Sequence, residues 1–472
     1  QRQMCIRDSI KIKGLNHMSK NKRSTFSGKL GFVLSAAGAS VGLGNIWRFP
    51  YLAAKYGGGI FLLVYIILAL TFGYTMIMAE TSLGRMTKKS PVGAYQSFGK
   101  SKWLSLGGWI NAIIPILIVP YYSVIGGWVI KYLIGYFSGQ AQTLASDTYF
   151  SAFISNGAST EICFIVFTFC TLGIIYAGVQ NGIERVSKFM MPVLVVLSVI
   201  IAIYSVTRPG ALEGVKYFLV PNPANFSWMT VVSAMGQMFY SLSIAMGILV
   251  TFGSYMLKDM SIEDSTQNVE IFDTAIAIMA GLMIIPAVFA FSGGDPDTLN
   301  AGPALMFITI PKVFANMGLG TGIGILFFLL VLFAAMTSSI ALTESAVSTF
   351  EDELYWGRKK STIVMAVIMV SLGSLSCLGY GPLANVTIIG MQFLDFFDFL
   401  TNSVMMPIAA IANCLLVSKV IGVKKIEEEV TLEGKPFRRK KIFYFMIQYL
   451  CPIFAAIILI SSVANAFGWI SM

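Results

Sequence analysis

The stretch Gly38-Ala39-Ser40-Val41-Gly42-Leu43-Gly44-Asn45 interrupts the first long apolar run of the chain with small and polar residues. A helix that breaks inside a membrane leaves backbone N–H and C=O groups without partners. Free carbonyls can coordinate a cation, and free N–H groups at the start of a half-helix attract an anion. This stretch therefore predicts a broken membrane helix that forms part of a binding site.

The chain around this stretch is apolar throughout. Of its 472 residues, 56% are hydrophobic and 12% are charged, whereas about 25% charged residues is usual in soluble domains. The apolar runs are continuous rather than alternating, and each is long enough to cross a bilayer as a helix of about 20 residues. We therefore expect an all-α polytopic membrane protein. Eleven transmembrane helices are predicted, at 32–54, 59–82, 104–135, 160–178, 187–206, 229–256, 269–292, 320–350, 361–379, 384–418 and 442–467.

The positive charges fall mainly on one side of the predicted spans. With the N-terminus in the cytoplasm, most of the 33 lysines and arginines lie in the N-terminal tail and the cytoplasmic loops. The positive-inside rule then fixes a cytoplasmic N-terminus, and an odd number of spans puts Met472 outside. These loops explain the net charge of +10, so we expect no nucleic-acid partner. The basic cluster 438–441 before the last span is predicted to lie near anionic lipid headgroups.

The remaining polar residues do not indicate an enzyme. The six cysteines form no CxxC pair and the single histidine is His17, so we expect neither a metal cluster nor histidine-based catalysis. Residues 1–31 are predicted as a cytoplasmic tail without a signal peptide. Because Met18 opens a start-like segment, residues 1–17 are interpreted as upstream or non-native sequence.

Span 6 has the same kind of interruption as span 1, at Ser241–Gly247. The two interrupted spans are five apart and run in opposite directions across the membrane. This pattern is typical of an inverted repeat with a binding site at the midplane. We expect one repeat at 32–206, the second at 229–418, and a separate last span at 442–467. The alternative is that the glycines only permit close helix packing.

Several motifs carry a family resemblance over residues 23 to about 420. They are GLGNIWRFPY at 42–51, GQMF at 236–239, SLS at 241–243, MTSS at 336–339 and EDEL at 351–354. In this order and spacing, the chain resembles the bacterial, eleven-span members of the neurotransmitter:sodium symporters, which are sodium-dependent amino-acid transporters. The resemblance implies sodium-coupled import of a small amino acid across the bacterial inner membrane by alternating access. It implies no enzymatic activity.

The resemblance further implies two sodium sites and no organic cofactor. The ligands are all oxygens, as a hard cation demands. The first site would use the substrate carboxylate with the Ser40 carbonyl and the side chains of Asn45, Ser241 and Asp273. The second would use the carbonyls of Gly38, Val41 and Ala334 and the hydroxyls of Thr337 and Ser338. Thr337 and Ser338 could instead bond back to their own helix.

The substrate is expected to be an apolar α-amino acid. Gly42 stands where amine-carrying relatives have an aspartate, so the substrate must bring its own carboxylate. By resemblance, the substrate would contact Ala39, Ser40, Gly42, Leu43, Gly44, Ile118, Tyr122, Ile125, Tyr240, Ser241, Ser243, Met246 and Leu342. Ala245 adds bulk where relatives often have glycine, which favours aliphatic or medium side chains over tryptophan.

Asp273 is a carboxylate inside a predicted span, which is costly and therefore a functional candidate. Animal relatives have a neutral residue at this position and bind chloride nearby. We expect Asp273 to supply that negative charge and to make transport chloride-independent. The alternative is that Asp273 lies at the cytoplasmic mouth and is hydrated.

Two charge pairs match the gates of the family. Arg48 and Asp398 would close the outer path, and Arg23 and Asp352 would close the inner path. Either pair could instead be an ordinary surface salt bridge, worth about 0–1 kcal/mol.

Other functions stay open at this point. The chain could carry another carboxylated solute, such as a betaine or an ω-amino acid. A channel or a ligand sensor on the same fold is a further alternative, although no span shows a polar stripe and no extra soluble domain is present. The expected partners are the substrate and the lipid bilayer, with the protein as a monomer or a dimer.

Overall fold

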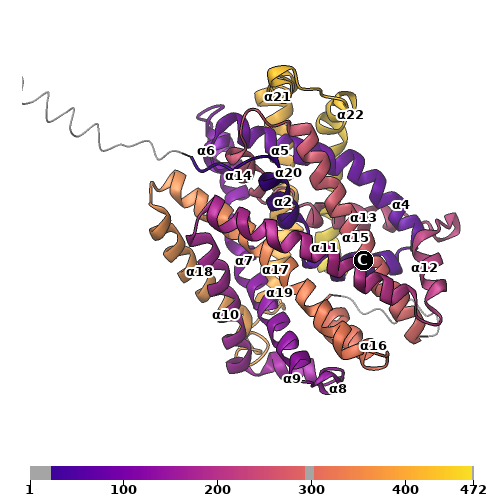
Figure 1. Cartoon of the computed structure of the whole chain (residues 1–472). Coiled ribbons are helices and arrows are strands. Elements are labelled where there is room, and N and C mark those ends of the chain that lie inside the picture. The colour runs from indigo at the N-terminus through magenta and orange to yellow at the C-terminus, as the bar shows by residue number, and fades with distance from the viewer. Residues whose placement is uncertain (1–22, 293–301, 470–472) are drawn as a thin grey trace, which may run out of the picture.

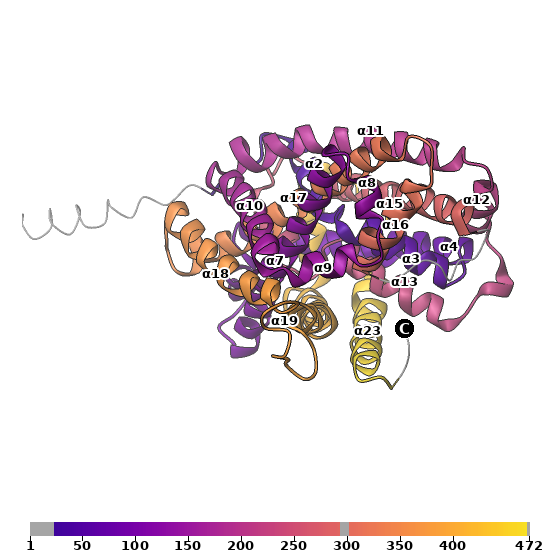
Figure 2. The same ribbon diagram turned by 90° about the horizontal axis from the view of Figure 1, so that it is seen from below.

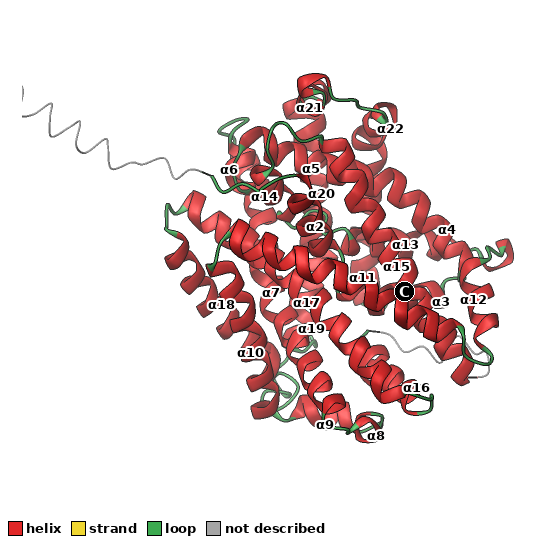
Figure 3. Cartoon of the chain, in the orientation of Figure 1, coloured by secondary structure: helices red, strands yellow, loops and turns green. Residues whose placement is uncertain are grey.

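The computed structural model describes residues 23–292 and 302–469 of the chain. Within these residues the secondary structure is helical, and the one extended pairing is an isolated bridge between Ile388 and Met391. Figure 3 shows helices joined by short loops. The prediction of an all-α fold is confirmed.

The first half of the chain contains the first broken helix and two of the longest helices. Its elements are α2 (Lys29–Ser40), η1 (Gly44–Arg48), α3 (Phe49–Lys55), α4 (Gly59–Leu68), η2 (Ala69–Gly73), α5 (Tyr74–Thr87), α6 (Pro91–Gln96), α7 (Lys102–Phe137), α8 (Ala141–Leu144), α9 (Tyr149–Ser155), α10 (Gly157–Tyr176), η3 (Val179–Glu184) and α11 (Arg185–Val206).

The second half repeats the pattern of a broken helix followed by long ones. Its elements are α12 (Ala211–Leu219), η4 (Pro223–Asn225), α13 (Trp228–Ser241), α14 (Ile248–Tyr255), α15 (Ile262–Ser292), η6 (Leu305–Thr309), α16 (Ile310–Ala315), α17 (Gly320–Glu353), α18 (Arg358–Leu378), α19 (Phe393–Asp398), η7 (Phe399–Met405), α20 (Met406–Leu415), η8 (Leu416–Ile421), α21 (Val423–Val430), η9 (Leu432–Gly434), α22 (Lys440–Phe445), η10 (Met446–Leu450) and α23 (Cys451–Ala466).

The count of spans agrees with a polytopic membrane protein. Among the described residues, nine helices are long and apolar enough to cross a membrane, and the bent pair α2 with η1–α3 makes a tenth. The pair α13 and α14, separated by residues 242–247, gives the eleventh when it is taken as one broken span. Exposed Ile162, Phe169 and Ile460 show that the outer surface is apolar, as lipid contact requires.

Three predicted span boundaries are wrong by seven residues or more, and one of them is the start of the fifth span, which lies at Val179 rather than 187. The tenth span was expected to begin at 384, but its helix begins at Phe393, because residues 384–392 form turns that include Gly390 at φ 77°. The seventh span begins at Ile262 rather than 269. Ser261 caps this helix by accepting a hydrogen bond from the N–H of Asp264 at 3.2 Å, so the helix starts with a polar turn that hydropathy does not detect.

The long helices α7 and α17 pack against each other and hold the site between them and the broken helices. α7 also packs against α10 and α18, whereas α14 packs against α5 and α11 against α15. Figures 1 and 2 show α10, α7 and α18 gathered on one side, with α23 at another edge, where it packs on α20. The two breaks therefore face each other in the middle of the bundle.

Candidate functional site

The first break lies between α2 and η1. α2 ends at Ser40, and the helix axis turns by 55° before it continues through Gly44–Lys55. Two positions in this break need glycine because side chains of other helices lie very close to the backbone there. A Cβ on Gly42 would lie 2.7 Å from Ser338 Oγ, and a Cβ on Gly44 would lie 2.4 Å from the Tyr240 ring. No larger side chain fits at either position unless these neighbours move.

The second break, residues 242–247 between α13 and α14, has a left-handed backbone at three positions. They are Ser243 at φ 53°, Ala245 at φ 60° and Gly247 at φ 71°. For Ser243 and Ala245 this conformation is strained, so something must hold it. The buried Glu80 carboxylate of α5 accepts the Ala245 N–H at 2.8 Å.

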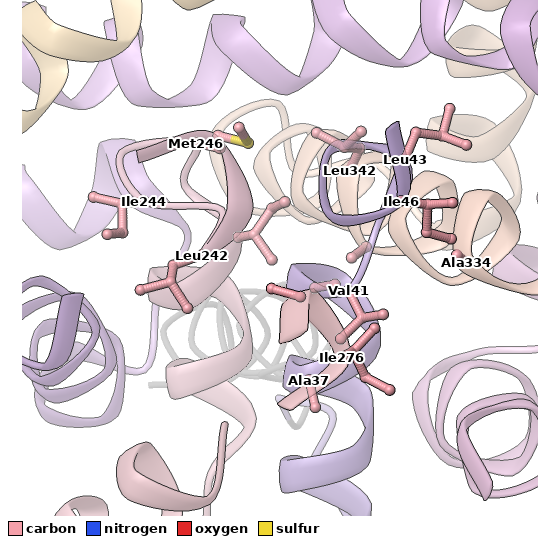
Figure 4. Close-up of a cluster of buried hydrophobic side chains, with 14 of the residues drawn as sticks. Ala37, Val41, Leu43, Ile46, Leu242, Ile244, Met246, Ile276, Ala334 and Leu342 are labelled. Atoms are coloured by element: carbon pink, nitrogen blue, oxygen red, sulfur yellow. The ribbon is translucent and has the colours of Figure 1, made fainter. Parts of the chain in front are cut away.

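A small cavity of about 30 Å³ lies where the two breaks meet. Figure 4 shows Val41 and Leu43 from the first break opposite Leu242, Ile244 and Met246 from the second. The cavity is lined by Ala39, Ser40, Gly42, Leu43, Gly44, Asn45, Ile118, Tyr122, Tyr240, Ser243, Met246, Ser338 and Leu342.

All but two of the predicted substrate contacts therefore line one cavity. The two exceptions are Ile125, which lines a different, outer cavity, and Ser241, which bonds to Asp273. At the cavity wall, the Tyr122 hydroxyl accepts the Leu43 N–H at 3.3 Å.

Asp273 is fully buried and lies at the centre of a polar cluster. Its carboxylate accepts hydrogen bonds from Asn45 Nδ2 at 2.8 Å, Ser241 Oγ at 2.9 Å and Tyr65 Oη at 3.1 Å. It sits in the interior of α15, which begins at Ile262, and not at a hydrated mouth. The structure thus brings Asn45, Ser241 and Asp273 together from three spans. Ser40 lies beside them on the cavity wall, with its hydroxyl bonded to the Ala36 carbonyl at 3.2 Å.

The predicted ligands of the second ion site meet where α17 crosses α2. The Ser338 hydroxyl, with one hydrogen to donate, lies within hydrogen-bond distance of three carbonyls across this contact, those of Ala39 at 3.1 Å, Gly38 at 3.3 Å and Val41 at 3.5 Å. The Thr337 hydroxyl instead bonds within its own helix, where the Phe333 carbonyl lies at 3.0 Å and the Ala334 carbonyl at 3.1 Å. Ser338 thus faces the break, whereas Thr337 adopts the ordinary back-bonded position.

The ion pair predicted for the inner gate is formed. Arg23 pairs with Asp352 at 2.6 Å and donates to Ser254 and Ser348 at 2.7 and 2.9 Å. Its guanidinium also stacks on the Tyr255 ring, 4.9 Å from the centroid. We call the end of the bundle that carries this pair the inner end.

The predicted outer pair is not formed in the described part of the chain. Arg48 stacks on the Tyr240 ring at 5.4 Å, while Asp398 accepts from Asn402 at 2.6 Å and Tyr121 at 3.2 Å. Arg48 and Asp398 line a cavity of about 400 Å³. The Arg23–Asp352 pair is thus formed, whereas Arg48 and Asp398 have other partners.

Sequence reasoning missed several buried carboxylates, and two of them hold the second break and the inner end of α17. Glu80 holds the second break, and Glu344 of α17 pairs with Arg358 at 2.5 Å and accepts from the Tyr255 hydroxyl at 2.7 Å. Both lie inside predicted apolar spans. The rule that singled out Asp273, a carboxylate at membrane depth, applies equally to them.

Two facing helix breaks, a cavity between them and an ion pair at one end are typical of a membrane transporter of the broken-helix type. The family model for the sodium:neurotransmitter symporter family matches residues 23–156 and 135–468. The chain belongs to this family and is therefore a sodium-dependent transporter rather than an enzyme.

Individual proteins that are similar to this chain support the same family assignment. An uncharacterized sodium-dependent transporter, YhdH of Bacillus subtilis, is 34% identical over 94% of this chain and 98% of its own. An uncharacterized sodium-dependent transporter of Haemophilus influenzae is 31% identical over 94% of this chain and 99% of its own. The crystal structure of MhsT in complex with L-phenylalanine superposes with a TM-score of 0.83 at 35% identity, over 93% of this chain and 100% of that one.

Proposed function

We propose that this protein is a sodium-coupled symporter that imports a small apolar α-amino acid. The observation that carries the proposal is the cavity where the two helix breaks meet. It combines backbone N–H groups near Leu43 and Gly44, polar Ser243, and an apolar wall that includes Ile118 and Leu342. A zwitterionic backbone needs both kinds of polar group, and its side chain needs the apolar wall.

The substrate carries its own carboxylate in this proposal. A carboxylate on a residue at position 42 would collide with Ser338 and Tyr122, since even a Cβ there lies 2.7 and 3.1 Å from their oxygens. The substrate carboxylate then meets the Leu43 N–H and the Tyr122 hydroxyl, which already lie 3.3 Å apart. The relative MhsT, whose crystal structure is a complex with L-phenylalanine, supports an apolar amino acid as substrate.

Two sodium ions accompany the substrate. The first is bound by Ser40, Asn45, Ser241 and Asp273, and the second by Gly38, Val41, Ala334, Thr337 and Ser338. The crossing of α2 and α17 supports the second site, because Ser338 already faces three carbonyls of the first break. Two charges that move down a potential of 100 mV supply about 5 kcal/mol, enough for accumulation of about a thousandfold.

Transport is proposed to be independent of chloride. Asp273 supports this, because its buried carboxylate accepts hydrogen bonds from Asn45, Ser241 and Tyr65. It supplies a fixed negative charge at this place, so the site has little need for chloride as a second negative charge. The proposed cycle opens the Arg23–Asp352 pair toward the cytoplasm while Arg48 and Asp398 close the outer path. Repeats 32–206 and 229–418 would rock against each other in a bacterial inner membrane, with the N-terminus inside and the C-terminus outside.

Uptake into proteoliposomes tests the proposal. Labelled amino acids are offered in turn, with sodium replaced by potassium and chloride by gluconate. We expect accumulation of small aliphatic amino acids that requires sodium and not chloride. Uptake that persists without sodium contradicts the central proposal, while uptake of betaines or ω-amino acids alone identifies a different carboxylated solute. Preference for tryptophan contradicts the size limit inferred from Ala245.

A further inference from the structure

A buried network of polar side chains supports the second break from outside the cavity. It includes Glu80 of α5, whose Oε1 accepts the Ala245 N–H at 2.8 Å. The same oxygen accepts a second hydrogen bond from Asn413 Nδ2 of α20 at 2.9 Å. In the described part of the chain, the other carboxylate oxygen, Oε2, is buried without a hydrogen-bond partner. Both bonds that orient this carboxylate therefore involve one oxygen, and Asn413 supplies one of them.

Asn413 is itself held in one orientation. The Tyr95 hydroxyl donates its hydrogen to Asn413 Oδ1 and accepts a hydrogen bond from Asn111 Nδ2 at 3.4 Å. The second hydrogen of the Asn413 amide goes to Asn111 Oδ1, also at 3.4 Å. A hydroxyl has one hydrogen and an amide group has two, so the contacts use all of them. Together they direct Asn413 Nδ2 toward Glu80.

The network is closed off from water. Glu80, Tyr95, Asn111 and Asn413 are each at most 1% exposed. A buried polar group that loses its partner cannot replace it with bulk water. Removal of the Asn413 amide would therefore leave the Glu80 carboxylate with the Ala245 N–H as its remaining donor among the described residues.

The elements that carry the network also surround the second break. α6 and α20 both pack on α7, which carries Asn111 (Figure 1). A Cβ on Gly247 would lie 2.7 Å from Pro91 of α6 and 2.8 Å from the Asn111 carbonyl. The break is thus enclosed by α6 and α7 at Gly247, and the polar network encloses it at Ala245.

Ala245 is a position of the break that needs such support. Its φ of 60° lies in the left-handed region, where a residue with a Cβ is strained. A hydrogen bond from its N–H to a fixed carboxylate therefore stabilises a conformation that alanine itself disfavours. Ser243 and Met246, on either side of it, line the cavity. A break that relaxed at Ala245 would displace groups of the substrate site.

We propose that Asn413 is a positioning residue for substrate binding: through Glu80, it holds Ala245 in the left-handed conformation that completes the substrate site. This inference rests on the proposed function. Asn413 is not among the residues that line the cavity, so it acts through the break and not by contact with the substrate. If the break is complete in only a fraction of the molecules, the apparent affinity for the substrate falls by that fraction.

A double-mutant cycle between positions 413 and 245 tests this proposal. Asn413→Leu replaces the amide by an apolar group of similar size, and Ala245→Gly removes the strain that the amide supports. The KM for labelled L-leucine is measured as initial sodium-dependent uptake into proteoliposomes, for the native protein, each variant and the double variant. The melting temperature of the same four proteins in detergent, without substrate, is the second readout.

The two readouts should show the same coupling. With the native Ala245, Asn413→Leu should raise KM about tenfold, which corresponds to the loss of one hydrogen bond of about 1.4 kcal/mol. Combined with Ala245→Gly, the rise should be about twofold or less, because glycine adopts this φ without strain. The melting temperature should also fall less in that combination. Tyr95→Phe, which keeps the ring and removes the hydroxyl, should act in the same direction with a smaller effect.

Cys414→Ala is the matched control. Cys414 is the next residue of α20, is also buried, and contacts Met76 Sδ at 3.7 Å. Its truncation should lower the melting temperature equally with Ala245 and with Ala245→Gly, and it should leave KM unchanged.

An unchanged KM in Asn413→Leu, or an equal rise with and without Ala245→Gly, would overturn the proposal. Losses in melting temperature that simply add would also overturn it. If Asn413→Leu does not fold, Tyr95→Phe takes its place in the cycle and the same criteria apply. A native protein without sodium-dependent uptake of L-leucine would count against the proposed function instead, and the melting-temperature cycle would still decide whether Asn413 supports Ala245.

Discussion

Replacing Asp273 by asparagine tests the polar cluster most directly. The change keeps the shape of the side chain and removes its charge. The carboxylate accepts three bonds, from Asn45 at 2.8 Å, Ser241 at 2.9 Å and Tyr65 at 3.1 Å. Hydrogen bonds to charged groups contribute about 1.5–3 kcal/mol, against about 0.5–1.5 kcal/mol for neutral ones. The cluster should therefore lose about 1–3 kcal/mol of affinity for a cation.

This loss predicts that the sodium concentration for half-maximal uptake rises about 5- to 150-fold, at 1.4 kcal/mol per tenfold change. The assay is initial uptake of the substrate into proteoliposomes over a range of sodium concentrations, with and without chloride. The variant should also gain stimulation by chloride, because an anion can replace the lost charge.

Asp264→Asn is the control, since it makes the same change on the same helix at a partly exposed site paired with Arg438. It should leave the sodium dependence unchanged. If Asp273→Asn keeps the native sodium dependence, Asp273 is not part of a sodium site.

Three further predictions follow from individual contacts. Gly44→Ala puts a Cβ 2.4 Å from the Tyr240 ring, and this overpacking should destabilise the site by about 1–3 kcal/mol. The measured uptake should fall at least tenfold, whereas near-native uptake would show that the ring moves freely. Arg358→Ala leaves the fully buried Glu344 without its ion pair and should destabilise the fold by about 3–5 kcal/mol, whereas Arg358→Lys should recover part of the thermal stability, measured in detergent. Burial, together with the charge of Arg85, lowers the pKa of Lys88 to about 8. Because the unfolded chain then binds more protons between pH 8 and about 10.5, native stability should rise with pH in that window, and Lys88→Met should flatten the rise in a melting series.

Much of the candidate site was predictable because its signals are local. Glycines and hydroxyls inside an apolar run identify the two breaks, and the family resemblance assigns Ala39, Tyr122 and Leu342 to the substrate site, where they line the cavity. The start of α15 at Ile262 was not predictable from hydropathy, because its polar first turn resembles a loop in composition. Likewise, whether the two predicted gate pairs form depends on where side chains meet across the bundle, which no local pattern specifies.

The sequence alone determined that this chain crosses a membrane many times and that its first and sixth spans break. Apolar length and helix-breaking residues act within about 20 residues, so they can be read locally. Only the tertiary structure decided which groups stabilise the breaks. Glu80 reaches Ala245 across 165 positions, and Asn45 reaches Asp273 across 228. Such contacts arise because buried polar groups must find partners wherever the packed helices bring them together.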